Sequence, residues 1–139
     1  MSLDTHKPLI SVVIPSFNHA KWIGAAIDSV ISQTYRNFEL LIIDNNSTDF
    51  TDEILANYSD GRIRVVKVKN LGSIAFSRNR ALDLARGEWI AFLDSDDSWK
   101  TNKLQTCSEH FNQETDFIYH NLTIISSEKK KRKDQTIKS

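Results

Sequence analysis

Short apolar segments alternate with amphipathic ones along the chain, and this pattern predicts strands and helices in turn. The strand-like segments are continuous or alternating apolar runs of five or six residues, too short to be helices. They are Leu9–Ile14, Phe38–Ile43, Ile63–Val68 and Trp89–Leu93. Pro15 is expected to end the first strand, because proline has no N–H to donate within a sheet.

Between these strands, apolar residues recur at the spacing of one helix face. The spacing predicts helices over residues 23–33, 52–58 and 74–85, and a fourth over about 101–111. Thr48 or Asp49 can cap the second helix at its start, and Gly87 stands where the third would take a C-terminal cap. Phe117–Tyr119 then begins a fifth strand, which Leu122–Ile125 can continue.

This alternation of strand and helix predicts the fold class. It is typical of a mostly parallel sheet covered by helices on both faces, because parallel neighbours need a crossover between them. We therefore expect an α/β protein with a Rossmann-like sheet. The expected domain spans residues 9–126, preceded by a leader (1–8) and followed by a basic tail or loop (127–139) that contains Lys129–Lys133.

Polar residues follow three of the four predicted strands directly. The segments are Pro15–Asn18 (PSFN), Asp44–Asp49 (DNNSTD) and Asp94–Trp99 (DSDDSW). In parallel sheets the carboxyl ends of the strands meet at one edge, and ligands bind outside that edge. The three segments are therefore expected to gather around one ligand site. His19 comes directly after the first segment, and for it we expect a surface role.

Three acids, Asp94, Asp96 and Asp97, stand within four positions at the end of an apolar strand. Two carboxylates about 4–6 Å apart repel each other by roughly 1 kcal/mol in water and by more at lower dielectric. Carboxylates suit a hard cation, and Mg²⁺ or Mn²⁺ commonly uses one or two of them together with water and substrate phosphates. Asp94 and Asp96 are thus candidate metal ligands, while Asp97 belongs either to the site or to a cap of the next helix.

Two other acidic motifs can be compared with this segment. An EF-hand loop beginning at Asp94 needs Gly at its sixth position and Glu at its twelfth, where the chain has Trp99 and Gln105, so that motif is excluded. An aspartate-dependent phosphatase of the haloacid dehalogenase type has D-x-D-x-[TV] after its first strand. Here the fifth position is Ser98 and the strand is the fourth, which leaves this enzyme as the weaker alternative.

Composition narrows the possible functions. The 139 residues include 18 basic and 18 acidic ones, and this zero net charge implies no general attraction to nucleic acid. Four glycines cannot build a glycine-rich phosphate loop, so a bound diphosphate would need a metal to balance its charge. A single cysteine, Cys107, excludes an intrachain disulfide, and no apolar run has the roughly 18–20 residues of a membrane span. We expect a cytoplasmic protein, with a peripheral position at the membrane as a second option.

Three blocks of the sequence carry a resemblance to a known family. They are SVVIPSFN (11–18), SVISQTYRNFELLIIDNNSTDFT (29–51) and SRNRALDLARGEWIAFLDSDDSW (77–99). In order and spacing, the chain from Leu9 to about Tyr119 resembles the N-terminal half of the inverting family 2 glycosyltransferases with the GT-A fold. The resemblance implies transfer of a sugar from a nucleotide-diphosphate donor to an acceptor hydroxyl, with Mg²⁺ or Mn²⁺ on the diphosphate, in polysaccharide or glycoconjugate biosynthesis.

The resemblance also implies roles for individual residues. Asp96 would bind the metal, and Asp94 would share the metal or lie near the ribose of the donor. Pro15 and Phe17 would lie in the nucleotide site with the aromatic ring against the base, and Arg78 is expected near the nucleotide. Asp44 and Asn45 occupy the first two positions of the family's D-D-[GN]-S segment, and Asn45 departs from the family, which usually has a second acid there that contacts the base. Since the second position is an amide here, which both accepts and donates, a UDP-sugar is the expected donor without being required.

An inverting transfer needs a general base, and no residue of the chain stands in the sequence context that the family uses for one. We therefore expect the donor-binding half of a glycosyltransferase truncated at its C-terminus, with a saccharide or lipid-linked acceptor and an uncovered sheet edge that favours self-association. The alternative is a non-catalytic module that binds nucleotide sugars or protein partners.

Overall fold

The computed structural model describes residues 6–69, 71–119, 122–124 and 135–137. The chain divides into two compact units between Thr106 and Cys107. The predicted leader and basic tail, including Lys129–Lys133, lie largely outside the described residues. Within the described part of the chain, none of the helices combines the length and the apolar character needed to cross a membrane.

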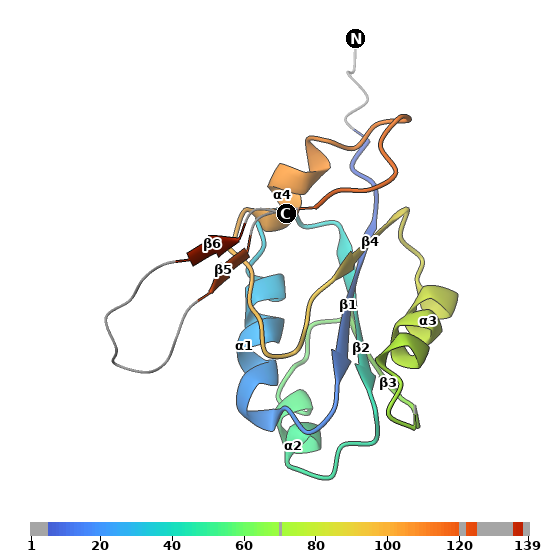
Figure 1. Ribbon diagram of the computed structural model, residues 1–139, viewed down its shortest axis with the longest axis vertical. Coiled ribbons are helices and arrows are strands. Elements are labelled where there is room, and N and C mark those ends of the chain that lie inside the picture. Colours follow the sequence, from blue (N-terminus) through green and yellow to red (C-terminus); the bar gives the residue numbers. More distant parts are fainter. Residues whose placement is uncertain (1–5, 70, 120–121, 125–134, 138–139) are drawn as a thin grey trace. The chain divides into compact units, whose positions relative to one another are not determined.

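The first unit contains a four-stranded sheet in which every neighbouring pair is parallel (Figure 1). Its strands are β1 (Ile10–Ser16), β2 (Phe38–Asp44), β3 (Ile63–Lys67) and β4 (Trp89–Phe92), in the order β3-β2-β1-β4. The helices are α1 (Ala20–Ile31), α2 (Thr51–Leu55), α3 (Ile74–Leu84) and the short α4 (Lys103–Ser108). The predicted Rossmann-like α/β fold is confirmed.

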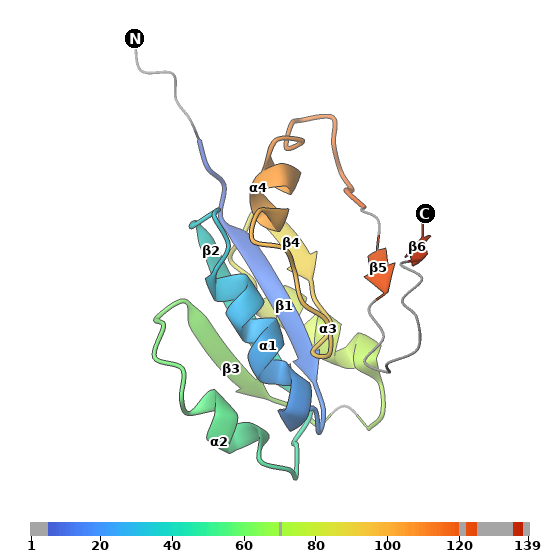
Figure 2. The same cartoon turned by 90° about the vertical axis from the view of Figure 1, so that its left-hand side faces the viewer.

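Helices cover both faces of the sheet, with α1 on one face and α3 on the other (Figures 1 and 2). On the α3 face, Val13, Leu41 and Ile43 form a buried cluster with Ala81 of the helix. Successive side chains of a strand point to opposite faces, so their fully buried sequence neighbours pack on the α1 face. Burial on both faces explains why these strands read as continuous apolar runs.

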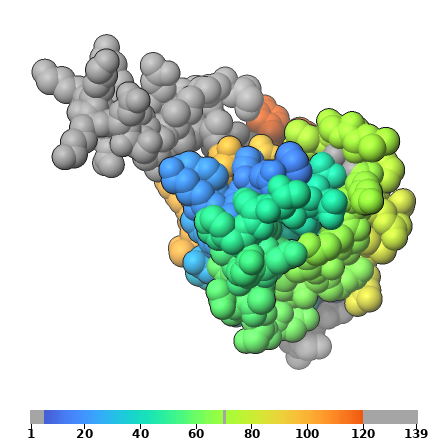
Figure 3. Space-filling view, turned by 90° about the horizontal axis from the view of Figure 1, so that it is seen from below, coloured from blue at the N-terminus to red at the C-terminus, as the bar shows by residue number. Residues whose placement is uncertain are grey.

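The strand order creates a switch point between β1 and β4. From β1 the chain moves outward to β2 and β3, and then returns through α3 to β4 on the other side of β1. The connections that leave β1 and enter β4 therefore cover opposite faces, which opens a crevice at the carboxyl ends of these two strands. Figure 3 looks onto this edge, where the blue segment after β1 lies beside the teal segment after β2.

Strand β1 continues through Pro15 to Ser16, two residues beyond the predicted end. The carbonyl of Val13 points toward β4, where it accepts a backbone hydrogen bond from Leu93. Backbone groups two residues apart in a strand point to the same side, so the side on which Pro15 lacks an N–H is also the β4 side. The ladder with β4 ends at Val13–Phe92, and no strand of the described sheet needs a donor from Pro15. The proline is tolerated because β4 is short.

Gly87 does not cap α3, which ends at Leu84 with Ala85 in an extended conformation. Instead its backbone passes very close to the start of β1, and a Cβ atom here would lie 2.5 Å from the Ser11 nitrogen and 2.8 Å from the Leu9 carbonyl oxygen. The Gly87 N–H donates to Ser11 Oγ at 2.8 Å. Close packing of two backbones, rather than helix termination, requires glycine here.

The prediction of a fifth strand at Phe117–Tyr119 is wrong. These residues have no strand structure, and the rings of Phe117 and Tyr119 stack with centroids 6.4 Å apart. The second unit instead contains β5 (Leu122–Ile124), which pairs antiparallel with β6 (Gln135–Ile137) in a separate sheet. Strands of three residues form mainly because a partner strand pairs with them. The local sequence pattern carries no information about that partner. Ile125 lies outside the described residues.

Candidate active site

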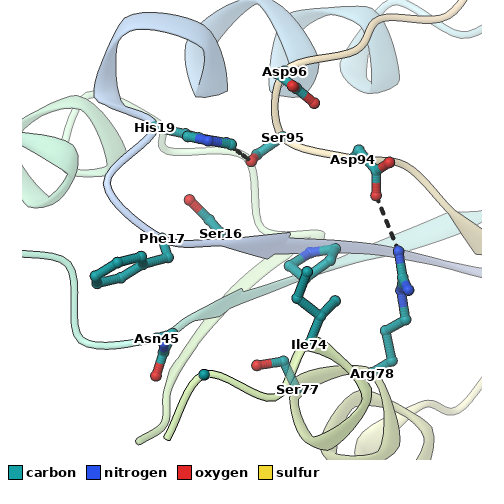
Figure 4. A pocket seen from close by; sticks show the side chains of 12 residues that line it. Ser16, Phe17, His19, Asn45, Ile74, Ser77, Arg78, Asp94, Ser95 and Asp96 are labelled. Atoms are coloured by element: carbon teal, nitrogen blue, oxygen red, sulfur yellow. Dashed lines mark hydrogen bonds and ion pairs between the residues drawn. The ribbon is translucent and has the colours of Figure 1, made fainter. Parts of the chain in front are cut away.

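A cavity of about 480 Å³ lies at the switch point of the sheet (Figure 4). One side is formed by the end of β1 and the loop after it, from Pro15 to His19. The opposite side is formed by the turn after β4, from Asp94 to Asp96. Asn45 after β2, Gly72 just before α3 and the first turns of α3 complete the lining. The polar segments predicted to gather around one ligand site do line one cavity.

Six of the seven residues predicted to contact the donor or the metal line this cavity. They are Pro15, Phe17, Asn45, Arg78, Asp94 and Asp96. The seventh, Asp44, is fully buried at the end of β2, and its carboxylate accepts hydrogen bonds from Ser47 Oγ (2.5 Å) and Ser47 N (3.1 Å). Lys67 Nζ lies 3.5 Å from the same carboxylate. Asp44 thus holds the turn that carries Asn45.

The three acids after β4 form a compact group. Asp94, Asp96 and Asp97 each offer a carboxylate oxygen, and these oxygens lie within 4.8 Å of one another on the exposed surface. The Asp97 N–H donates to the Asp94 carbonyl at 3.0 Å, which closes the turn. Neighbouring protein atoms desolvate the Asp97 carboxyl and the charges of Asp96 and Asp94 repel it, so its pKa lies above the usual range. Asp97 does not cap a helix, since α4 begins at Lys103.

Arg78 of α3 faces this acidic turn across the cavity. Its Nη2 donates to Asp94 Oδ1 at 3.1 Å (Figure 4). The guanidinium also lies 5.8 Å from the centre of the Phe92 ring. Both charged side chains are about half exposed, so solvent screens the pair and its contribution to folding stability is small. The arrangement places a permanent positive charge beside the acids, within reach of an anionic ligand.

The loop after β1 is fastened to the loop after β2 by Asn18. Its backbone adopts φ 49°, a left-handed conformation that asparagine tolerates better than most residues. Its side-chain oxygen accepts from the backbone of Thr48 at 2.8 Å, and its own N–H donates to Ser47 Oγ at 2.9 Å. Two of the loops that line the cavity are therefore held as one piece.

Asp49 extends this connection to the helices. One carboxylate oxygen accepts from the Ala20 N–H at the start of α1 (3.0 Å), and the other accepts from the Thr51 N–H at the start of α2 (3.0 Å). The hydroxyl of Thr51 adds a further bond, which together with the backbone bonds lowers the pKa of Asp49. Of the two predicted caps, Asp49 is the one whose side chain serves the first turn of α2.

The expected surface role of His19 is wrong. His19 lines the cavity and its Nδ1 lies 2.5 Å from Oγ of Ser95, the residue between Asp94 and Asp96 (Figure 4). Ser95 is itself buried, with 3% of its surface exposed. The only signal in the sequence was position, because both residues follow strands that end at the same edge. The imidazole thus connects the start of α1 to the acidic turn.

Gln33 holds the same segment further along the chain. Its buried amide lies just beyond α1, where Nε2 donates to the Lys100 carbonyl at 2.7 Å and Oε1 accepts from the Leu104 N–H at 2.9 Å. The backbone of Thr34 also donates to the Thr101 carbonyl at 2.9 Å. The segment 100–104, which follows the acids, is therefore hydrogen-bonded to the residues just beyond the C-terminal end of α1.

Fold and site together define a Rossmann-like α/β protein with a ligand cavity at the switch point of its sheet. The family model described as "Glycosyl transferase family 2" matches residues 11–138, and the chain therefore belongs to this family. The resemblance seen in the three sequence blocks is confirmed.

Individual relatives agree with this assignment. The chain is 42% identical over 120 residues to the UDP-Glc:alpha-D-GlcNAc-diphosphoundecaprenol beta-1,3-glucosyltransferase WfgD of Escherichia coli, covering 86% of this chain and 47% of WfgD. Among solved structures, residues 1–349 of S. aureus TarS in complex with UDP match with a TM-score of 0.68 and 32% identity, over 72% of this chain and 31% of that one. The mannosyltransferase PcManGT from Pyrobaculum calidifontis, in complex with GDP-Man and Mn²⁺, matches with a TM-score of 0.66 and 26% identity, over the same shares of the two chains. The chain spans less than half the length of the curated relatives it matches first.

Proposed function

We propose that this chain binds a nucleotide-diphosphate sugar together with a divalent cation, as the donor-binding part of an inverting glycosyltransferase. The observation that carries the proposal is the meeting of two acids, an arginine and an exposed aromatic ring around one cavity at the switch point. Asp94 and Asp96 offer oxygen ligands, Arg78 offers positive charge and Phe17, 52% exposed, offers an apolar face. A nucleoside diphosphate with its counter-ion needs these three kinds of contact.

The acidic turn fits a hard divalent cation. Its carboxylate oxygens lie within 4.8 Å of one another, close enough to share one ion, and a bound cation would balance the negative charge that the three acids bring together. Asp96, with Asp94, would hold Mg²⁺ or Mn²⁺, and the Mn²⁺ in the PcManGT complex supports this choice of metal class. The bound cation would supply positive charge to the diphosphate as it leaves the sugar.

For the nucleotide we propose uridine. Phe17 would lie against the base, Asn45 would hydrogen bond to its edge, and Arg78 with Asp94 would contact the remainder of the nucleotide. WfgD is named for UDP-Glc and the TarS structure contains UDP, which supports a uridine donor here. A direct contact between Asp44 and the nucleotide stays a prediction. In the structure the Asp44 carboxylate already has Ser47 and Lys67 as partners.

For the acceptor we propose a saccharide or lipid-linked hydroxyl. WfgD is named for an acceptor linked to diphosphoundecaprenol, which supports a lipid-linked or saccharide acceptor for this protein. A lipid-linked acceptor would bring a cytoplasmic enzyme to the membrane as a peripheral protein. We assign no general base among the described residues, so this chain is expected to bind the donor better than it turns it over.

Titration calorimetry tests the proposal directly. The chain is titrated with UDP, GDP and ADP, each with Mn²⁺, with Mg²⁺ and with a chelator. We expect UDP to bind with metal and to lose most of its affinity in the chelator. Failure of every nucleoside diphosphate to bind with either metal would overturn the proposal. Release of sugar from UDP-glucose by the chain would exclude the alternative of a non-catalytic binding module.

Replacement of His19 by Ala should weaken the response to metal without abolishing nucleotide contact. The acidic turn loses the bond that holds Ser95, so we expect about tenfold more Mn²⁺ for half-maximal UDP binding, the usual size for loss of a supporting residue. His19→Asn is the matched control, because its amide can reach the same hydroxyl. Identical Mn²⁺ titrations for wild type and His19→Ala would show that the bond to Ser95 does not position the turn.

We also propose that the chain self-associates through β4. In the described sheet β4 pairs with β1 on one side only, and Phe92 keeps 45% of its surface exposed. A free strand edge with apolar side chains readily pairs with another copy. Sedimentation velocity at increasing protein concentration should show a rising average mass, and a monomer at every concentration would contradict this expectation.

A further inference from the structure

The hydroxyl of Ser16 is a buried polar group with no partner among the described residues. Ser16 is the last residue of β1, only 5% of its surface is exposed, and its Oγ makes no hydrogen bond. Its backbone is satisfied, because its carbonyl accepts from the Asn45 N–H at 2.8 Å. The unpartnered atom is therefore the side chain alone, and Ser16 lines the cavity.

Ser11 on the same strand provides a comparison, because its buried hydroxyl has hydrogen-bond partners within the fold. It is also fully buried, but its hydroxyl donates to Glu39 Oε1 at 2.6 Å and accepts from the Gly87 N–H at 2.8 Å. The Glu39 carboxylate in turn accepts from the Arg86 N–H at 2.7 Å. Ser11 thus belongs to a satisfied network at the opposite end of the sheet from the cavity.

A buried polar atom without a partner costs the folded protein free energy, and such atoms are rare unless they serve a purpose. A second one lies in the same cavity, since Arg78 Nε is also buried, has no hydrogen bond to the described residues and can act only as a donor. Figure 4 shows Ser16 between Asn45 and Phe17 on one side and His19 and Ser95 on the other. A ligand that offers acceptor oxygens would satisfy both atoms.

We infer that Ser16 is a ligand contact, whose hydroxyl donates a hydrogen bond to an oxygen of the bound nucleotide. The inference rests on the proposed function and adds a residue to it. The contact lies between the residues assigned to the base and those assigned to the metal and diphosphate. The unpartnered hydroxyl is kept in the fold because the bound nucleotide provides its partner.

Alanine variants of the two serines on β1 separate a ligand contact from a structural one. Each variant of the full chain is titrated with UDP in the presence of Mn²⁺, and its thermal unfolding is measured without ligand. Ser16→Ala should bind UDP roughly tenfold more weakly, as loss of one hydrogen bond to a ligand does, and should unfold at the same temperature as wild type or higher. Ser11→Ala should show the reverse, with unchanged affinity and a lower unfolding temperature.

Two results would overturn the inference. If Ser16→Ala unfolds at a clearly lower temperature, its hydroxyl is employed within the fold. If Ser16→Ala binds UDP as wild type does, while Asp96→Asn has lost metal-dependent binding, then the nucleotide is bound as proposed but Ser16 does not contact it. Absence of UDP binding to wild type is a different result, which would overturn the proposed function together with this inference.

Discussion

Replacing Asp96 by Asn should abolish the metal-dependent binding of UDP to this chain. Asp96 lines the cavity and belongs to the cluster of carboxylate oxygens, and an amide cannot supply the negative charge that a divalent cation needs. Loss of a supporting residue around a metal already costs about 10–100-fold in affinity, so loss of a ligand should cost roughly a hundredfold or more. Calorimetry with UDP and Mn²⁺ measures this loss.

Asp97→Asn is the matched control for this change. Asp97 lies in the same acidic group but does not line the cavity, so its replacement removes the same charge and should weaken UDP binding only a few-fold. Equal losses in the two variants would mean that total charge, rather than coordination by Asp96, governs the response to metal. Both variants relieve repulsion within the turn, and neither should unfold more easily than wild type when metal is absent.

Replacing Gly87 by Ala should destabilise the fold strongly. The new Cβ would lie 2.5 Å and 2.6 Å from the nitrogen and Oγ of Ser11, and a backbone so placed cannot move aside cheaply. Either β1 shifts away or the hydrogen bond from Gly87 to Ser11 breaks, which also disturbs the buried carboxylate of Glu39. We expect a loss of about 2–3 kcal/mol in the free energy of unfolding, measured by urea denaturation.

Gly61→Ala provides the comparison for Gly87. No atom lies within 4 Å of the position that its Cβ would take. The change should therefore be neutral, or stabilise by a few tenths of a kcal/mol through the unfolded chain. If both alanine variants unfold at the same urea concentration as wild type, the close approach of Gly87 to β1 does not require glycine.

Much of the fold was predictable because its strands are buried on both faces. The apolar runs that became β1 to β4 carry their own signal, and the alternation with helical segments determined the parallel sheet. Pro15 and Gly87 were interpreted through local rules, as the end of a strand and the cap of a helix. In the structure each depends on a neighbouring strand. Pro15 fits within β1 because β4 is short, and Gly87 is required because the backbone of β1 lies so close to it.

The same distinction applies to the site. Phe17, Asn45 and Asp96 were predicted to lie at the site because each lies in a segment that follows a strand at the shared edge and aligns with a family motif, and all three line the cavity. His19 was assigned a surface role, and Ser95 and Ser16 were not singled out, because the importance of all three comes from partners, or the lack of one, across the cavity. The bond between His19 and Ser95 joins residues 76 positions apart, which no local spacing predicts.

Helix α1 touches the acid-bearing segment at two places, through His19 just before its first residue and through Gln33 just after its last turn. The distance and the relative orientation of these two contacts are set by the length of the helix. One inserted residue would lengthen it by about 1.5 Å and rotate its end by about 100°. Substitutions on the exposed side of α1 should be tolerated among homologues, whereas insertions or deletions within it should not, because they would misalign the acids 60 or more residues further along the chain.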